Sequence, residues 1–151
     1  MKNNFLFSLF SLLFFLSACG GTVSQADYGL EMEAKSGAVA PQYLLGKSLV
    51  ESGKRQEGMM WLCKAAFAGY SPAQSEIGNV YRSDKNKALK KSEFPNDDVL
   101  AYAWYSIAAA NKNANAAGIQ YEIASRLSFD ELKKAKKMVA DYPILPCEIK
   151  E

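Results

Sequence analysis

The chain of 151 residues contains no histidine. This absence excludes His-dependent catalytic triads, imidazole acid–base chemistry and His-ligated metal sites. An excess of charge of one sign is also missing, because 18 lysines and arginines stand against 16 acidic residues. Nucleic-acid-binding domains carry a basic excess, so the charge balance argues against that class. Cysteine and tryptophan are rare, with three and two copies, so each copy can be considered individually.

Long hydrophobic runs are confined to the first eighteen residues. Lys2 precedes the apolar run Phe5 to Leu16. At 1.5 Å per residue this run is too short for the ~30 Å hydrocarbon core of a bilayer, so we expect an export signal over residues 1–18. The run ends in Leu16-Ser17-Ala18-Cys19, which resembles a bacterial lipobox. The alternative is an ordinary cleaved signal followed by a free or paired cysteine.

The lipobox resemblance implies that the Cys19 thiol carries a diacylglycerol and that its amino group carries a third acyl chain. Two such signals already suffice for stable membrane anchoring. Gly20 follows the cysteine, where inner-membrane retention usually has Asp, so we expect the outer membrane, periplasmic face, of a Gram-negative cell. Residues 19–25 are small and polar and are predicted to form a lipidated tether.

Two stretches of the remaining chain read alike. The pairs Leu45-Gly46 and Ile77-Gly78 lie 32 residues apart, and Trp61 and Trp104 lie 43 apart, each followed by a pair of alanines. Repeats of this length are typical of α-solenoids. Proline near helix starts and glycine after helix ends predict helices over 41–52, 55–68 and 72–83. Ser71 and Gln74 form a candidate capping box for the third of these helices.

The repeated pattern of Leu-Gly, Trp, Ala-Ala and a closing Gly resembles the Sel-one-like repeat family of tetratricopeptide-like α/α repeats. The first copy departs from that pattern at Leu49 and Gly58, and in the second copy Lys112 replaces the closing glycine. Residues 26–36 resemble a lone second helix and 114–127 a degenerate first helix. The resemblance implies an all-α fold, a short solenoid of about two and a half repeats over residues 26–141.

The expected repeat core consists of small residues that allow close helix packing and large apolar residues that fill the remaining space. Its members are Leu45, Gly46, Trp61, Ala65, Ala66, Ile77, Gly78, Tyr81, Trp104, Ala108 and Ala109. Trp61 and Trp104 are predicted to be equivalent core residues. Tyr43, Lys47, Gln74 and Asn79, with Gln120, are candidates for a partner-binding surface on the first helices.

Ser128 and Glu131 predict a capping box for a C-terminal capping helix that is rich in lysine. Its polar face suits the end of a solenoid, and contact with anionic lipid is the alternative interpretation. Residues 82–93, rich in lysine, are predicted to form a solvated connection, or alternatively a basic clamp for an acidic segment. Asp97 and Asp98 are expected at the start of the helix that carries Trp104, where they favour the helix dipole.

Cys63 and Cys147 are the thiols that remain if Cys19 is lipidated. Export into an oxidising compartment favours a bridge between them, but two free thiols and an intermolecular bond stay open. Cys147 lies in the tail 142–151, which is extended by Pro143 and Pro146. The apolar residues Tyr142, Ile144, Leu145 and Ile149 predict that this tail packs back on the solenoid.

No catalytic residue, metal site or cofactor is predicted. The resemblance implies a scaffold or adaptor that holds a protein or peptide, so we expect a monomeric, lipid-anchored binding module without enzymatic activity, whose partners are an envelope protein or peptide and the membrane. One alternative is a hydrolase of cell-wall or β-lactam substrates, although no Ser–Lys or carboxylate motif stands out. Another is a small envelope or exclusion lipoprotein that binds a foreign or secretion-system protein.

Overall fold

The computed structural model describes residues 25–82 and 97–143, together with Leu145 and Cys147. Within these ranges every regular element is an α-helix. In order they are α1 (Gln25–Lys35), α2 (Val39–Glu51), α3 (Arg55–Phe67), α4 (Ser71–Tyr81), α5 (Asp98–Ala110), α6 (Ala114–Ala124) and α7 (Phe129–Ala140). The three helices predicted over 41–52, 55–68 and 72–83 are confirmed, with ends that differ by at most two residues. The predicted lone helix (26–36), degenerate first helix (114–127) and capping helix are present as α1, α6 and α7.

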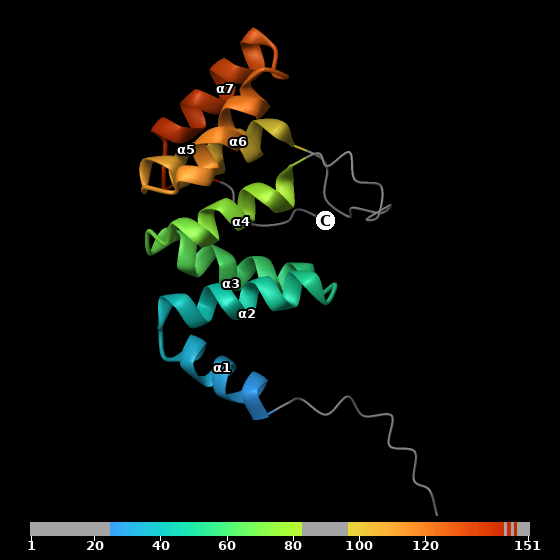
Figure 1. The fold of residues 1–151 in the computed structure, drawn as a ribbon, viewed down its shortest axis with the longest axis vertical. Coiled ribbons are helices and arrows are strands. Elements are labelled where there is room, and N and C mark those ends of the chain that lie inside the picture. Colours follow the sequence, from blue (N-terminus) through green and yellow to red (C-terminus); the bar gives the residue numbers. More distant parts are fainter. Residues whose placement is uncertain (1–24, 83–96, 144, 146, 148–151) are drawn as a thin grey trace, which may run out of the picture.

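The helices stack in sequence order into an elongated array with α1 at one end and α7 at the other (Figure 1). Each helix from α1 to α5 packs against the next, and α2 also contacts α4. This arrangement of packed neighbouring helices is that of an α/α solenoid, which confirms the predicted fold class. At the far end α7 packs on α5.

The turns between helices repeat with the sequence. The amide N–H groups of Gly37, Gly69 and Lys112 donate to the carbonyls of Ala34, Ala66 and Ala109 at 3.2, 3.0 and 3.0 Å. Gly37 and Gly69 have φ of 98° and 85°, and Lys112 takes the same left-handed region with φ of 65°. Glycine adopts this conformation without steric cost, whereas a residue with a side chain, such as lysine, adopts it at a steric cost. The departure from the repeat at Lys112 therefore leaves the geometry of the turn intact.

Small residues set the distance between paired helices. A Cβ atom on Gly46 of α2 would lie 2.8 Å from the Gly58 carbonyl oxygen, and one on Gly58 of α3 would lie 2.6 Å from the Gly46 carbonyl oxygen. Neither contact is tolerable for a side chain. In the next pair, Gly78 of α4 lies against the Tyr105 ring, where a Cβ would come within 2.9 Å. The departure from the repeat pattern at Gly58 therefore has a structural reason, which is the close approach of the Gly46 backbone.

The core is centred on α3, α4 and α5. Of the predicted core residues, Ala65, Ala66, Ile77, Gly78, Tyr81, Trp104 and Ala108 are buried, and Gly46 is buried between α2 and α3. Leu45, Trp61 and Ala109 are only half-buried. The predicted equivalence of the tryptophans is wrong, because Trp104 is fully buried while the partly open Trp61 ring is covered by the Lys64 ammonium, 4.0 Å from the ring centre.

The helix starts follow local chemistry. Asp97 caps α5 by accepting a hydrogen bond from the Leu100 N–H at 2.9 Å, and Asp98 lies in the first turn, as expected. Ser128 and Glu131 form the predicted capping box of α7. The capping box predicted for Ser71 and Gln74 is wrong, because α4 begins without a side-chain cap and the Gln74 amide is engaged elsewhere.

Candidate binding surface

Equivalent positions on the first helices of successive pairs lie on open faces of α2, α4 and α6. Lys47 corresponds to Asn79, 32 residues later, and to Glu122, a further 43 residues later. One helical turn earlier on the first two helices are Leu44 and Glu76. We call these five residues the first-helix stripe. Leu44 is 51% exposed, Asn79 is exposed, and the side chains of Lys47 and Glu122 are 40% and 53% exposed.

Charges on the stripe are held by neighbouring side chains. Lys47 pairs with Glu51 one turn along α2 at 3.8 Å. Asn79 donates from Nδ2 to the Glu76 carboxylate at 3.1 Å, and its carbonyl oxygen accepts from the Tyr105 hydroxyl. The Lys47–Glu51 pair is an exposed ion pair, which contributes little to stability, so Lys47 can exchange partners at small cost.

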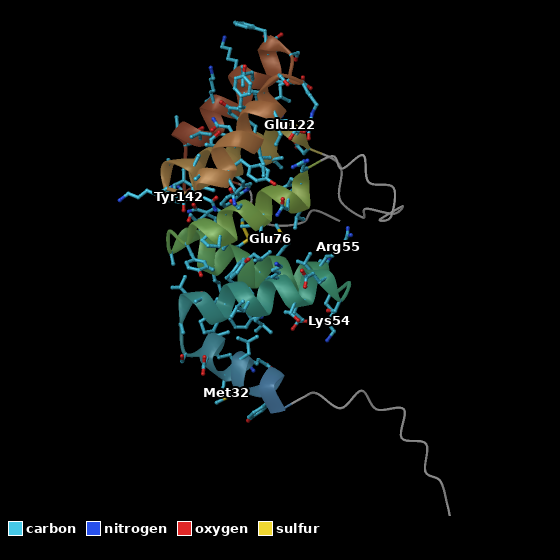
Figure 2. The ribbon with its side chains drawn as sticks, viewed as in Figure 1. Met32, Lys54, Arg55, Glu76, Glu122 and Tyr142 are labelled. Atoms are coloured by element: carbon cyan, nitrogen blue, oxygen red, sulfur yellow. A yellow bond between two sulfur atoms is a disulfide. The ribbon has the colours of Figure 1, made fainter. Side chains whose placement is uncertain are left out.

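A cluster of exposed and half-buried ion pairs lies at the α6 end of the stripe. Arg126 contacts Glu122 at 2.8 Å and Asp98 at 3.3 Å, and Arg82 contacts Glu122 at 3.8 Å. The cluster connects α4, α5 and α6. Figure 2 shows Glu76 near the middle of the stack and Glu122 towards its α6 end. The stripe therefore carries both signs of charge and one exposed apolar side chain, which suits a protein or peptide better than a single class of ion.

Gln74, predicted to bind a partner, is fully buried and does not line a free surface. Its Nε2 donates to the Ala66 carbonyl at 2.9 Å, and its Oε1 accepts from Asn111 Nδ2 at 2.9 Å. The equivalent Gln42 donates to the Ala34 carbonyl at 3.2 Å. In both repeats, therefore, a buried glutamine satisfies a carbonyl in the last turn of the preceding helix, eight residues earlier. Buried polar groups need such partners, so these glutamines are structural.

The remaining candidates have mixed outcomes. Tyr43 is half-buried and packs against the Tyr70 ring, with 5.5 Å between ring centres, while Lys47 and Asn79 do lie on the open stripe. Gln120 is half-buried and donates to the Tyr102 hydroxyl at 3.2 Å. The shared spacing of 32 residues between the Gln42–Gln74 and Gly46–Gly78 pairs was the sequence signal that Gln74 belongs to the internal repeat.

The C-terminal tail fills a second surface, on α3, α4 and α5. The Tyr142 hydroxyl donates to the Ala66 carbonyl at 2.9 Å and lies 3.4 Å from Gln74 Nε2. The centre of its ring lies 6.2 Å from that of Phe67 and 6.3 Å from that of Trp104, the latter edge-on. Tyr142 therefore satisfies a helix-end carbonyl and packs against the buried Trp104 ring. The predicted packing of the tail is confirmed for Tyr142 and Leu145, while Ile144 and Ile149 lie outside the described residues.

Cys63 and Cys147 are joined by a disulfide that spans 84 residues, with Cα atoms 5.8 Å apart. The sequence left open an intramolecular bridge, two free thiols or an intermolecular bond, and the structure has the intramolecular bridge. Cys63 and Cys147 are both buried. The bridge links the tail to α3 within one turn of the point where Tyr142 meets Ala66.

The last residue of α4 and the residue before α5 lie side by side. The Asp97 N–H donates to the Tyr81 carbonyl at 3.0 Å. Burial, followed by the negative charge of Asp97, raises the pKa of the Tyr81 hydroxyl above its ordinary value, so it stays protonated. The predicted connection or clamp over 82–93 lies, beyond Arg82, outside the described residues.

The described part of the chain contains no cluster of three or more acidic, cysteine or histidine side chains able to hold a metal ion. Within the same residues, no helix is both long and apolar enough to cross a membrane. The comparisons with known proteins add no relative: no family model matches the chain, and no curated protein is significantly similar to it.

Proposed function

We propose that the chain is a protein-binding module of the Sel-one-like repeat type, anchored by lipid on Cys19 at the periplasmic face of the outer membrane. It acts as a scaffold or adaptor and catalyses no reaction. Stacked helix pairs act by presenting a continuous surface to a partner, and a solenoid of this length presents one short surface. The lipobox-like sequence Leu16-Ser17-Ala18-Cys19 supports the anchor.

One observation carries the choice of surface. The tail with Tyr142 and Cys147 already covers parts of α3, α4 and α5, whereas the first-helix stripe on α2, α4 and α6 remains open. Leu44 provides an exposed apolar contact there, and Lys47 and Glu122 provide opposite charges at equivalent positions. We infer that a protein or peptide segment with an apolar side chain flanked by charges binds along this stripe.

Site-resolved crosslinking in cells tests this proposal. A photoreactive amino acid is placed at Leu44, and in a matched control at Met60 of α3, which is apolar and similarly exposed at 57%. We expect a discrete partner adduct from position 44, none from position 60, and a lower yield when Lys47→Glu reverses the charge beside it. Equal adducts from both positions, or no effect of Lys47→Glu, contradict binding at the stripe.

A further inference from the structure

Helix α1 presents an apolar face that no described residue covers. Tyr28 is 62% exposed and Met32 is 53% exposed, and the two lie one turn apart on the same side of the helix. Lys35 follows on the same side, since residues three and four apart are neighbours on a helix surface. The opposite side of α1 packs on α2, where Ala34 is buried and its carbonyl accepts from Gln42.

This face points out of the stack. Helix α1 forms one end of the solenoid, and Figure 2 shows Met32 on the side of α1 turned away from α2. In the pairs α2–α3 and α4–α5 the second helix is packed against a first helix. Among the described residues α1 has no such first helix, so an apolar surface is left at the end of the repeat array.

We propose that the occupant of this face is the lipid surface to which the chain is anchored, with the Tyr28 and Met32 side chains inserted at the level of the headgroups. This inference rests on the proposed lipid anchor at Cys19. Five residues lie between Cys19 and Gln25, and the six residue-to-residue steps from one to the other span at most about 20 Å in an extended chain. The end of the solenoid that carries Tyr28 is therefore held close to the membrane.

The side chains suit an interface between water and hydrocarbon. Tyrosine combines an apolar ring with a polar tip and is enriched at this level of membrane proteins, and lysine extends its charge to water from an apolar stem. Lys35 pairs with Glu31 at 2.5 Å, and hydrogen bonding to Glu31 raises the pKa of Lys35, so the lysine keeps its charge. Since the pair is neutral overall, insertion depends on Tyr28 and Met32 and not on anionic lipid.

A second copy of the chain fits this face less well. Stable protein–protein interfaces bury at least about 1,200 Å² in total, far more than two side chains on one short helix provide. The exposed Glu33 lies about 100° around the helix from Met32, at the edge of the face, where it would remain in water at a membrane surface.

The test uses the lipidated full-length chain, purified from membranes and reconstituted into vesicles of phosphatidylethanolamine and phosphatidylglycerol, with or without brominated acyl chains. One variant carries Tyr28→Trp. The matched control carries Phe129→Trp at the α7 end, where the phenylalanine is 82% exposed. Emission is measured as the difference from the parent, which contains Trp61 and Trp104. Circular dichroism verifies that both variants keep the parent's helicity.

We expect the added emission of Tyr28→Trp to shift to shorter wavelength and to be quenched by brominated lipid, with little dependence on salt. A second change, Met32→Asp, should remove most of that quenching, and Phe129→Trp should not be quenched. Flotation of the protein with the vesicles without quenching at position 28, or equal quenching at 129, overturns the inference while the anchor stands. Failure to float, with an unacylated Cys19 by mass, overturns the anchor as well.

Discussion

Gly46 and Gly58 illustrate how single residues decide the spacing of helices in this stack. Each occupies the place where a Cβ on the other would collide with backbone oxygen, at 2.8 and 2.6 Å. The repeat pattern that the chain resembles has alanine at the position of Gly58. The close approach of α2 and α3 therefore depends on having glycine on both helices.

Gly58→Ala is expected to destabilise the protein by about 1–3 kcal/mol, because α2 and α3 must separate to admit the methyl group. Helix propensity alone predicts the opposite, a gain of about 1 kcal/mol for alanine over glycine. Urea unfolding of wild type and variant decides between the two effects. A more stable Gly58→Ala protein would show that the helices do not approach as closely as described.

Trp104→Ala is expected to lower the free energy of unfolding by about 3–5 kcal/mol through the cavity it leaves, which is a large share of a small domain's stability. Trp61→Ala should cost far less, about 1 kcal/mol, since Trp61 is half-buried and outside the core. Chemical denaturation of the two variants gives the comparison. Similar decreases in the free energy of unfolding of both variants would indicate that the two tryptophans are equivalent after all, and would contradict the difference described here.

At the scale of helices, local signals make most boundaries predictable from the sequence. Pro72 in the first turn of α4, glycine at 53 and 69, and Ser128 with Glu131 act within a few residues, and the structure has the corresponding helix ends. The difference in burial between Trp104 and Trp61, and the internal position of Gln74, were not predictable in the same way. Both Trp104 and Gln74 contact Tyr142, which lies distant in sequence: its ring lies edge-on to Trp104 and its hydroxyl lies 3.4 Å from Gln74 Nε2.

The capping box of α7 predicts a pH dependence. Hydrogen bonds from the Ser128 hydroxyl and N–H, at 2.7 and 2.8 Å, lower the pKa of Glu131 below its ordinary value. A carboxyl whose pKa is lower in the folded state stabilises the protein above its unfolded-state pKa, and that contribution is lost as the pH falls through the folded-state value.

Ser128→Ala should therefore raise the pKa of Glu131, measured by NMR titration of its side chain. The stability difference between wild type and Ser128→Ala should be largest near neutral pH and should shrink in acid. Glu131→Gln in the same background is the control, because it removes the titrating group while keeping the side chain's size. An unchanged pKa of Glu131 in Ser128→Ala would show that the box does not form in solution.

At the scale of the whole molecule, the tail connects the last helix to α3. Closing the loop between Cys63 and Cys147 should stabilise the fold by roughly 4 kcal/mol in the chain-entropy model. Cys147→Ser should lower stability by about that amount and should make the tail sensitive to protease. Cys63→Ser is the matched control and should behave alike. Thiol titration of unfolded, unreduced periplasmic protein should find no free thiol, whereas two free thiols in a monomer would contradict the bridge.

The proposed lipid anchor, the proposed membrane contact of α1 and the open stripe on α2, α4 and α6 together describe a short solenoid that projects from a membrane and holds a partner. The fold could be predicted because its signals recur at the repeat spacing. The partner could not be predicted, because the side chains of the exposed stripe differ from repeat to repeat. Equivalent positions hold a basic, a neutral polar and an acidic residue, Lys47, Asn79 and Glu122.

The most direct test of this account is the chemical state of Cys19 in the mature protein, because a membrane-held scaffold requires it. We predict that the N-terminal peptide of protein extracted from outer membranes begins at Cys19 and carries the mass of a diacylglycerol and a further acyl chain, with metabolic incorporation of palmitate. Cys19→Ala should abolish the label and leave uncleaved or soluble protein. A Cys19→Ala protein that still labels with palmitate and fractionates with the outer membrane would contradict the account.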